Sequence, residues 1–261
     1  MKLLVKLGGT LLDAEATRGS LADQIVSVAR RVPTVVVHGG GRRLTRYLAE
    51  RGVESRFVNG LRVTSPEVLD AVVKVVAGSV NRQLTAALNL AGARAVGISG
   101  IDAGLVIAEP LDAALGSVGR VVQADPALLD ALLDAGFLPV VACVAGDRHG
   151  RLYNVNADQM AAACAAAFGA DQLMFLTDVE GVLDAQKRLL PRLTMSDSEA
   201  LIAAGAASGG MLAKLRAAQA ALRQGVPEVR IAAGAADRIL ERIVAGEEAG
   251  TRLLAAEVCA P

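Results

Sequence analysis

Hydrophobic and polar positions follow two different patterns along this chain. Short runs of aliphatic and β-branched residues predict β-strands at residues 2–7, 34–38, 95–99, 138–143, 173–177 and 229–232. Longer segments, in which apolar residues recur every three or four positions, predict helices at residues 20–31, 42–52, 157–168, 196–204, 211–224 and 237–245. Two more short runs, at residues 105–108 and 117–123, predict a two-stranded excursion.

Start and stop signals add two helices to this pattern. The segment Ser65-Pro66-Glu67 supplies an N-cap side chain, a proline for the first helical position and an acid for the first turn. A long helix should therefore begin there. The pair Asp125-Pro126 opens another helix, which Gly136 closes.

The order strand, glycine turn, helix repeats along the chain, which is typical of βαβ units. We therefore predict a three-layer α/β/α sandwich around a mainly parallel open sheet, with binding sites outside the carboxyl ends of the strands. No linker rich in proline or serine interrupts the chain, so residues 1–261 should form a single domain with two lobes, about 1–170 and 171–255. The tail, residues 255–261, should be frayed.

Composition narrows the possible functions. The 27 basic and 27 acidic residues cancel, which argues against a general nucleic-acid binder. Aromatic residues make up only 2% of the chain, so a platform for stacking single-stranded bases is not expected. No run of 18 apolar residues appears, and the N-terminal apolar run is too short for a signal peptide, so we expect no membrane span.

The cysteines point to a reducing compartment. Cys143, Cys164 and Cys259 are odd in number and far apart, so neither a disulfide framework nor a CxxC pair can be read from them. We expect free thiols and a cytoplasmic protein.

The first candidate for chemistry lies after the first strand. Gly8 and Gly9 let the backbone approach an oxyanion with its N–H groups, and Lys6 adds a mobile positive charge. Taken alone, the same residues describe a surface lysine before an ordinary turn, because short motifs match by chance.

A second glycine turn follows the second strand. Gly39, Gly40 and Gly41 lead into a helix, whose N-terminus reinforces an anion site. Neither glycine turn has the GxGxxG spacing of a dinucleotide fold, and the phosphate-binding GxxxxGK[ST] loop is absent from the sequence. His38 precedes these glycines, and we favour an oriented core histidine over a general base.

Polar residues before two helices are further candidates. Arg62, in an NGLRVT segment, could fork onto a carboxylate, although a surface arginine is the simpler interpretation. Asn156 suits the N-cap of a helix, and Asp158 suits its first turn. Alternatively, Asn154 clamps a substrate and Asp158 holds catalytic lysines in place.

The C-terminal part offers two more candidates. Asp178 ends a strand and could bond a nucleotide ribose or a backbone turn. Lys214 follows a glycine pair at the start of a helix, where it is either a second phosphate-side lysine or a solvated helix lysine.

Together, the order and spacing of these pieces resemble the amino acid kinase family over nearly the whole chain. The matching segments are VKLGG (residues 5–9), VVVHGGG (35–41), NGLRVT (59–64), SGIDAGL (99–105), GFLPVV (136–141), NVNADQMA (154–161), LTDVEGVLD (176–184), GGMLAKLRAA (209–218) and GTRL (250–253). The NGLRVT segment is typical of the branch that phosphorylates N-acetyl-L-glutamate.

The resemblance implies transfer of the γ-phosphoryl group of ATP to a side-chain carboxylate, which gives an acyl phosphate in arginine biosynthesis. Lys6 and Lys214 would neutralise charge in the transition state, and Asp158 would orient both. The implied backbone donors are Gly8, Gly9, Gly40 and Gly41. Arg62 and Asn154 would hold the substrate's α-carboxylate.

The resemblance also implies the nucleotide site and the metal. The nucleotide would lie in the C-terminal lobe, with the amino acid in the N-terminal one. Its implied contacts are Gly8, Asp178, Gly181, Val182, Ala207 and Ser208. Mg²⁺ would be carried by ATP phosphates and water, without a dedicated protein cage.

Oligomeric state and exact substrate stay open. Family members that form arginine-inhibited hexamers carry an extra helix before the first strand, whereas here that strand begins at Lys2. We therefore expect a homodimer that arginine does not inhibit. Two alternatives to this reaction remain. One is a kinase for acetylated or carrier-linked aminoadipate, and the other is a non-catalytic sensor of acetylglutamate or nucleotide.

Overall fold

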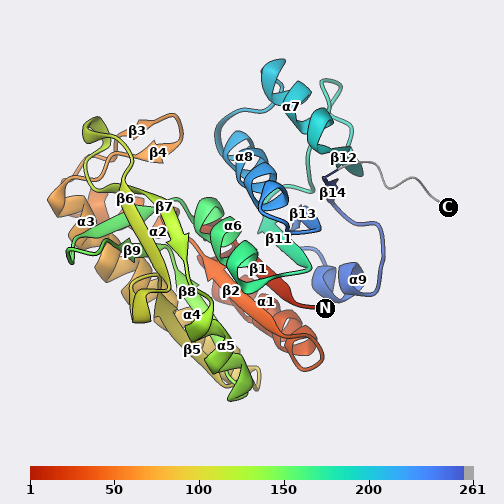
Figure 1. The fold of residues 1–261 in the computed structure, drawn as a ribbon, viewed down its shortest axis with the longest axis horizontal. Helices are drawn as coiled ribbons and strands as arrows, with labels where there is room; N and C mark the ends of the chain where they lie inside the picture. The colour runs from red at the N-terminus through yellow and green to blue at the C-terminus, as the bar shows by residue number, and fades with distance from the viewer. Residues whose placement is uncertain (256–261) are drawn as a thin grey trace.

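The computed structural model describes residues 1–255 and is built on one eight-stranded sheet, in the order β12-β14-β13-β11-β1-β2-β8-β5 (Figure 1). The strands are β1 (Leu3–Leu7), β2 (Thr34–His38), β5 (Ala95–Ser99), β8 (Leu138–Ala142), β11 (Gln172–Thr177), β12 (Arg192–Thr194), β13 (Glu228–Ala233) and β14 (Thr251–Leu254). Only the β13–β14 pair is antiparallel within this sheet as described. The predicted mainly parallel sheet is confirmed.

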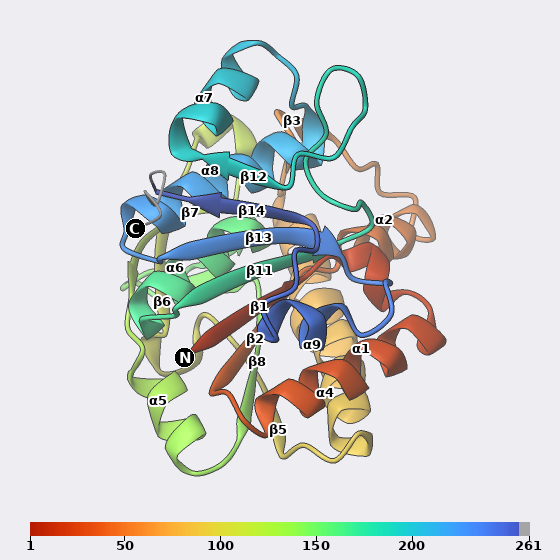
Figure 2. The ribbon, with the colours of Figure 1, turned by 90° about the vertical axis from the view of Figure 1, so that its right-hand side faces the viewer.

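Helices cover both faces of the sheet, which confirms the three-layer sandwich (Figures 1 and 2). One face carries α1 (Glu15–Ala29), α4 (Asn81–Leu90) and α9 (Ile239–Val244), and the other carries α5 (Ala127–Asp134), α6 (Ala157–Phe168) and α8 (Gly209–Arg223). Because the central strands are covered on both sides, every residue of β1, β2, β8 and β11 is buried. Aliphatic side chains fill this core, as the scarcity of aromatic residues requires.

A small closed barrel lies beside the N-terminal half of the sheet (Figure 1). It joins β6 (Val106–Pro110), β7 (Val118–Ala124), β9 (Val144–Gly146) and β10 (Leu152–Val155) in the order β10-β7-β6-β9. The predicted two-stranded excursion is confirmed as the antiparallel β6–β7 pair. β9 and β10 were not predicted, because strands of three and four residues around a polar turn give too short a pattern.

A two-stranded hairpin, β3 (Phe57–Val58) and β4 (Leu61–Arg62), stands at the edge of the N-terminal half. Asn59 and Gly60 form its turn with φ angles of 50° and 79°, the left-handed conformations that a tight two-residue hairpin requires. This hairpin was not predicted, because strands of two residues give no periodic pattern.

The remaining helices follow the predicted signals closely. Ser65 Oγ accepts a hydrogen bond from Val68 N, and the long helix runs through α3 (Pro66–Val72), a π-helical turn η2 (Val73–Val80) and α4. The other short elements are η1 (Gly9–Leu12), α2 (Gly41–Ala49), η3 (Asp102–Gly104), η4 (Ala113–Leu115) and α7 (Met195–Ala203). Two boundaries were wrong by three residues or more. The helix α1 begins at Glu15, five residues before the predicted start, and α2 ends at Ala49, three residues before the predicted end.

Several expectations concern the rest of the chain. Cys143 and Cys164 are free and buried, and burial raises the pKa of both thiols, to about 11 and about 12. Cys259 and the tail expected to fray, apart from residue 255, lie outside the described residues. Within the described part of the chain, no helix is long and apolar enough to cross a membrane.

Candidate active site

The carboxyl ends of β1 and β2 bring the two predicted glycine turns together. A Cβ atom on Gly9 would lie 3.0 Å from the backbone nitrogen of Gly41, and one on Gly40 would lie 3.2 Å from Val76 Cγ2. Glycine is therefore required for the turns to approach this closely.

These turns leave backbone N–H groups pointing out of the sheet. Gly9 begins η1 and Gly41 begins α2, and the first N–H groups of a helix have no partner within the helix. Such groups, together with the positive end of the helix dipole, favour an anion. Gly8 differs from the prediction: its N–H donates to Leu176 O at 2.9 Å, so it continues the sheet and offers no free donor.

Beside the turns, three charged side chains lie close together at the N-terminal end of α6. Lys6 points from β1 toward the first turn of α6, where Asp158 Oδ1 lies 2.5 Å from Lys6 Nζ. Lys214, from the second turn of α8, places its Nζ 3.6 Å from Asp158 Oδ2. The predicted cluster is thus assembled, from a strand and two helices that are distant in the sequence.

Burial makes this cluster electrostatically tight. The side chains of Lys6 and Asp158 are only 6% and 7% exposed. Burial by itself would raise the pKa of Asp158, but the positive charges of Lys6 and Lys214 outweigh it and hold that pKa below its ordinary value. Burial lowers the pKa of Lys214, and Lys6 adds to this effect, while Asp158 opposes it.

One carboxylate between two ammonium groups leaves the cluster with one net positive charge when all three are ionised. With the free N–H groups of the glycine turns, this charge forms a site that suits an anion such as a transferred phosphoryl group. Across residues 1–255, no group of three or more His, Cys, Asp or Glu side chains is placed to hold a metal ion.

A cavity of about 220 Å³ opens beside this cluster. Its lining includes Lys6, Gly9, Gly40, Gly41, Arg62, Asn154 and Asp158. This volume is below the roughly 300–1,000 Å³ of pockets for drug-sized ligands, and it suits a small metabolite. The structure therefore brings the predicted substrate-side residues into one cavity.

Arg62 is held in place from several sides. Its Nη2 donates to Thr45 Oγ1 at 2.8 Å and to Gly41 O at 3.1 Å, and its Nη1 donates to Ser55 Oγ. The ring of Phe57 lies 4.5 Å from the guanidinium carbon. Only 7% of the residue is exposed, so its simpler interpretation as a surface arginine was wrong.

Asn154 is linked to Arg62 through a buried threonine. Asn154 Nδ2 donates to Thr64 Oγ1 at 3.0 Å, and Thr64 Oγ1 donates to the carbonyl of Arg62 at 2.8 Å. This chain of hydrogen bonds ties β10 to the end of the NGLRVT segment. Asn156 caps α6, with its Oδ1 accepting from the backbone nitrogens of Asp158 and Gln159, as predicted.

His38 is a core residue, as favoured from the sequence. It is 0% exposed, its Nδ1 donates to Gly39 O, and its Nε2 accepts from Asn81 Nδ2 at 3.0 Å. Burial lowers the pKa of His38 to about 4, against the hydrogen bond to Gly39, and the charges of Lys6 and Arg82 add to the lowering. The ring is therefore neutral near pH 7, and both of its nitrogens are hydrogen-bonded within the protein.

The predicted nucleotide residues after β11 differ in accessibility. Asp178 is exposed at the end of the strand and accepts a hydrogen bond from Thr177 Oγ1. Gly181 lies against Thr251, where a Cβ atom would be 2.5 Å from Thr251 Oγ1. Val182 is 2% exposed, and both its N–H and its carbonyl are already bonded within the protein, so it offers no free polar group.

Ala207 and Ser208 lie at the N-terminus of α8, nearly two turns before Lys214. Ser208 is exposed and is the N-cap residue, but its side chain accepts no bond from the first N–H groups of α8. Ala207 is buried beneath it. A helix N-terminus of this kind favours an anion.

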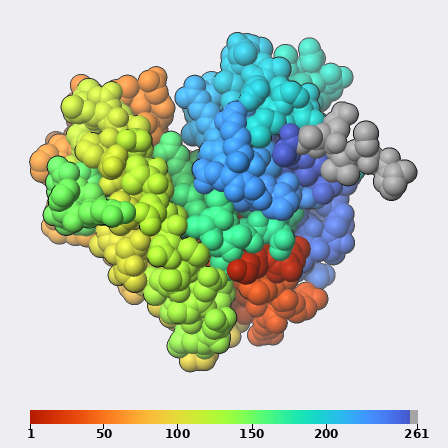
Figure 3. Space-filling model, viewed as in Figure 1, coloured from red at the N-terminus to blue at the C-terminus, as the bar shows by residue number. Residues whose placement is uncertain are grey.

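On the opposite side of α8, a groove runs between the two halves of the molecule (Figure 3). Residues of β7, α6 and α8 line it. This groove was not predicted from the sequence. Nor were several apolar residues that line the cavity beside the lysine cluster, among them Leu44, Phe57, Val76, Val118 and Cys143. Apolar lining residues look like core in a sequence, so no local signal marks them.

Known proteins are similar to this chain over nearly its full length. A protein named acetylglutamate kinase from Solibacter usitatus (strain Ellin6076) is 62% identical over 257 residues, which cover 98% of this chain and 100% of the relative. Another acetylglutamate kinase, from Geobacillus kaustophilus (strain HTA426), is 45% identical over 233 residues, 89% of this chain and 90% of the relative.

A solved structure gives the same fold. The N-acetylglutamate synthase from Neisseria gonorrhoeae, complexed with coenzyme A and N-acetyl-glutamate, superposes with a TM-score of 0.87 at 27% identity. The match covers 98% of this chain and 60% of the synthase chain. The model of the amino acid kinase family matches residues 1–233. With a family match over most of its length and relatives that align nearly end to end, the chain belongs to the amino acid kinase family.

Proposed function

We propose that this protein transfers the γ-phosphoryl group of ATP to the side-chain carboxylate of N-acetyl-L-glutamate, in arginine biosynthesis. The observation that carries the proposal is the buried Lys6–Asp158–Lys214 cluster beside two glycine turns, in a chain that is 62% identical to an acetylglutamate kinase. The cluster provides the positive charge that phosphoryl transfer requires.

The reaction forms a bond between a carboxylate oxygen and the γ-phosphorus and breaks the bond from that phosphorus to the bridging oxygen of ADP. A carboxylate is already deprotonated near pH 7, so no general base is needed, and the buried neutral His38 is not required for one. Catalysis is then mainly positioning and neutralisation of charge. Lys6 and Lys214 would act from either side of the transferred group, while Asp158 fixes both ammonium groups.

The cavity beside the cluster would hold the amino acid. Arg62 would bind the α-carboxylate, and Asn154 would bind the same end of the substrate, because one hydrogen-bond chain joins the two residues. The backbone N–H groups at Gly9, Gly40 and Gly41 would receive the reacting carboxylate and the phosphoryl oxygens.

The nucleotide would lie on the C-terminal part, residues 171–255. The N-terminus of α8 at Ser208 would face its phosphates, and Asp178 with the loop around Gly181 would contact the nucleoside. Val182, by contrast, would shape this loop from beneath, because its polar groups are already bonded. Residues 1–170 would then form the amino-acid lobe.

Mg²⁺ would enter with ATP as part of the substrate. The donor set fits this arrangement: the one carboxylate in the cluster already faces two ammonium groups, so it is a poor ligand for a hard cation. Bound to the nucleotide, the ion would neutralise phosphate charge.

We further propose a cytoplasmic homodimer. ATP is a cytoplasmic cosubstrate, and an apolar edge of the fold supports the dimer: β5 is an edge strand whose residues Ala95–Ile98 are half-buried, and Leu90 beside it is 92% exposed. A second copy of the chain would cover this edge. Sedimentation at several protein concentrations tests this, and a monomer at all of them would contradict it.

A hydroxamate assay tests the reaction. The protein is incubated with Mg-ATP, hydroxylamine and one acceptor at a time: N-acetylglutamate, N-acetylaminoadipate, aspartate or glutamate. Hydroxylamine traps an acyl phosphate as a coloured product. Product with N-acetylglutamate is the expected result, while product only with N-acetylaminoadipate would shift the substrate by one methylene. Folded protein that makes no product with any acceptor would favour the sensor alternative.

A further inference from the structure

The GTRL segment, Gly250 to Leu253, has no role in the reaction described so far. It begins β14, which runs antiparallel to β13 with Thr251 opposite Ile231. Thr251 is 0% exposed, yet its side chain is polar. A buried hydroxyl needs hydrogen-bond partners, and both partners of Thr251 Oγ1 lie in the loop between β11 and β12.

That loop, residues 178–191, folds back on itself as a hairpin. Leu183 and Leu189 form an antiparallel bridge, and Asp184 N donates to Arg188 O at 2.9 Å. At the tip, Asp184 Oδ1 accepts from the backbone nitrogens of Gln186 and Arg188. The tip is therefore stabilised by its own residues.

The base of the hairpin depends on Thr251. Leu190 N donates to Val182 O at 2.9 Å, and in a regular antiparallel pair the reverse bond from Val182 N to Leu190 O would accompany it. Instead, Thr251 Oγ1 accepts from Val182 N at 2.8 Å and donates to Leu190 O at 2.7 Å. The hydroxyl is inserted between the two strands of the hairpin.

The adjacent glycine fits closely around this hydroxyl. A Cβ atom on Gly181 would lie 2.5 Å from Thr251 Oγ1 and 3.0 Å from Thr251 N. The loop backbone therefore rests directly on β14, with no side chain between them.

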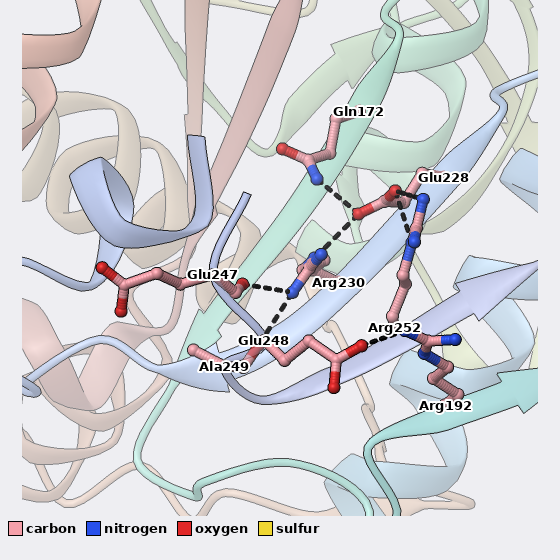
Figure 4. Close-up of polar contacts among 8 residues, drawn as sticks. All are labelled: Gln172, Arg192, Glu228, Arg230, Glu247, Glu248, Ala249 and Arg252. Atoms are coloured by element: carbon pink, nitrogen blue, oxygen red, sulfur yellow. Dashed lines mark hydrogen bonds and ion pairs between the residues drawn. The ribbon is translucent and has the colours of Figure 1, made fainter. Parts of the chain in front are cut away.

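The strand that presents Thr251 is itself firmly held (Figure 4). Arg230 Nη1 donates to the carbonyls of Glu247 and Ala249 at 3.2 Å, and Glu228 accepts from both Arg230 and Arg252 at 2.7 Å. Gly250 has a φ of +71°, and a Cβ atom there would lie 2.3 Å from Ile231 O. These contacts fix where β14 starts and therefore where the hydroxyl lies.

We infer that Thr251 is a positioning residue for nucleotide binding. Its hydroxyl sets the base of the 178–191 hairpin, and through Gly181 and Val182 it sets the loop that would face the nucleoside. It does not touch the amino-acid cavity, so its effect should fall on the nucleotide alone. That the ligand is ATP rests on the proposed function. The contact between Thr251 and the hairpin does not.

The test compares Thr251→Val, which keeps the shape and removes the hydroxyl, with Thr251→Ser, which keeps the hydroxyl. Thr34→Val is the matched control, because Thr34 is also buried and bonded through Oγ1, to Val32 O, at the far end of the sheet. Michaelis constants for ATP and for N-acetylglutamate are measured in each variant. In parallel, NMR follows amide exchange at Val182 without ligand.

Thr251→Val should raise KM for ATP about tenfold and change KM for N-acetylglutamate less than twofold, because it unpairs a buried N–H and a carbonyl. Exchange at Val182 should be faster by at least tenfold. Thr251→Ser should recover most of both effects, and Thr34→Val should show neither. If Thr251→Val does not fold, Thr251→Cys replaces it, since a thiol is a weak donor and acceptor.

Equal changes in both Michaelis constants, the same KM shift in Thr34→Val, or no recovery in Thr251→Ser would overturn the inference. A failure of the proposed function gives a different result, because the wild-type protein then forms no hydroxamate. In that case the affinity for Mg-ADP, measured by calorimetry in each variant, replaces KM for ATP. Unchanged exchange at Val182 in Thr251→Val would overturn the inference whatever the reaction proves to be.

Discussion

Lys6 and Asp158 form an ion pair inside the protein, with 2.5 Å between Lys6 Nζ and Asp158 Oδ1. Lys6 is the penultimate residue of a strand whose every residue is buried, and an isolated charge there would cost several kcal/mol in desolvation. Asp158 reduces this cost and fixes the direction of the ammonium group. The pair therefore connects the packing of the sheet to the chemistry at its carboxyl edge.

Lys6→Ala should lower kcat by roughly 10²–10³, the size of effect seen when one electrostatic donor is removed from a transition state. KM for N-acetylglutamate should change less than threefold, because the lysine acts mainly on charge that develops during transfer. Steady-state kinetics with both substrates measure this. Weaker acetylglutamate binding at unchanged kcat would contradict the assigned role.

Asp158→Asn should destabilise the fold by about 3–5 kcal/mol, since it leaves Lys6 and Lys214 facing each other without a counter-charge. The pKa of Asp158 is depressed in the folded state, so its contribution to stability is present above about pH 4 and is lost as the pH falls further. Urea titrations of both proteins at several pH values give the difference. A constant difference down to the lowest pH at which both fold would argue against this coupling.

His38 should dominate the pH dependence of stability between about pH 6.5 and 4. Its pKa falls from 6.5 in the unfolded chain to about 4 in the folded protein, so the unfolded chain takes up a proton first and stability decreases as the pH is lowered through this window. The shift corresponds to roughly 3 kcal/mol. His38→Gln should remove this dependence.

The chain has only two histidines, which provides a control for that measurement. His149 is exposed on a turn, so His149→Gln should keep the wild-type pH dependence. If both variants behave alike, the effect does not come from burial of His38.

Arg62→Lys should raise KM for N-acetylglutamate by about 10–100-fold and leave KM for ATP within twofold. Lysine keeps the charge but loses the planar fork that bonds a carboxylate at two points. It also loses the bonds to Thr45 and Gly41 that orient the side chain. Kinetics with each substrate varied in turn decide this, and a rise in KM for ATP alone would refute it.

Gly9→Ala should lower kcat by at least tenfold, because the added methyl group would lie 3.0 Å from the nitrogen of Gly41 and force the two glycine turns apart. Gly19→Ala is the control. A Cβ atom there meets no atom within 4 Å, and the residue lies within α1, so this change should stabilise the protein by about 0.5–1 kcal/mol without affecting kcat. Thermal unfolding and kcat are measured together.

Features that depend on neighbouring residues in the chain could be predicted from the sequence. The cap at Ser65, the glycine that ends the Asp125-Pro126 helix and the full extents of β2 and α6 were all predicted, because caps, turns and periodicity are properties of adjacent residues. The candidate catalytic residues also came from the sequence. However, the choice between Asp158 as a helix-start acid and as a partner of lysines came from resemblance alone.

Which distant residues contact one another could be seen in the three-dimensional fold alone. The fold brings Lys6 and Lys214 to one carboxylate and places the hydroxyl of Thr251 inside a hairpin. The N–H groups of Gly8 and Val182 are already hydrogen-bonded within the protein, so they are not free donors. These contacts join segments far apart in the chain, and they depend on strand order and side-chain packing rather than on local preference. A pattern along the sequence shows which residues can do chemistry, while the order of strands in the sheet determines which of them can do it together.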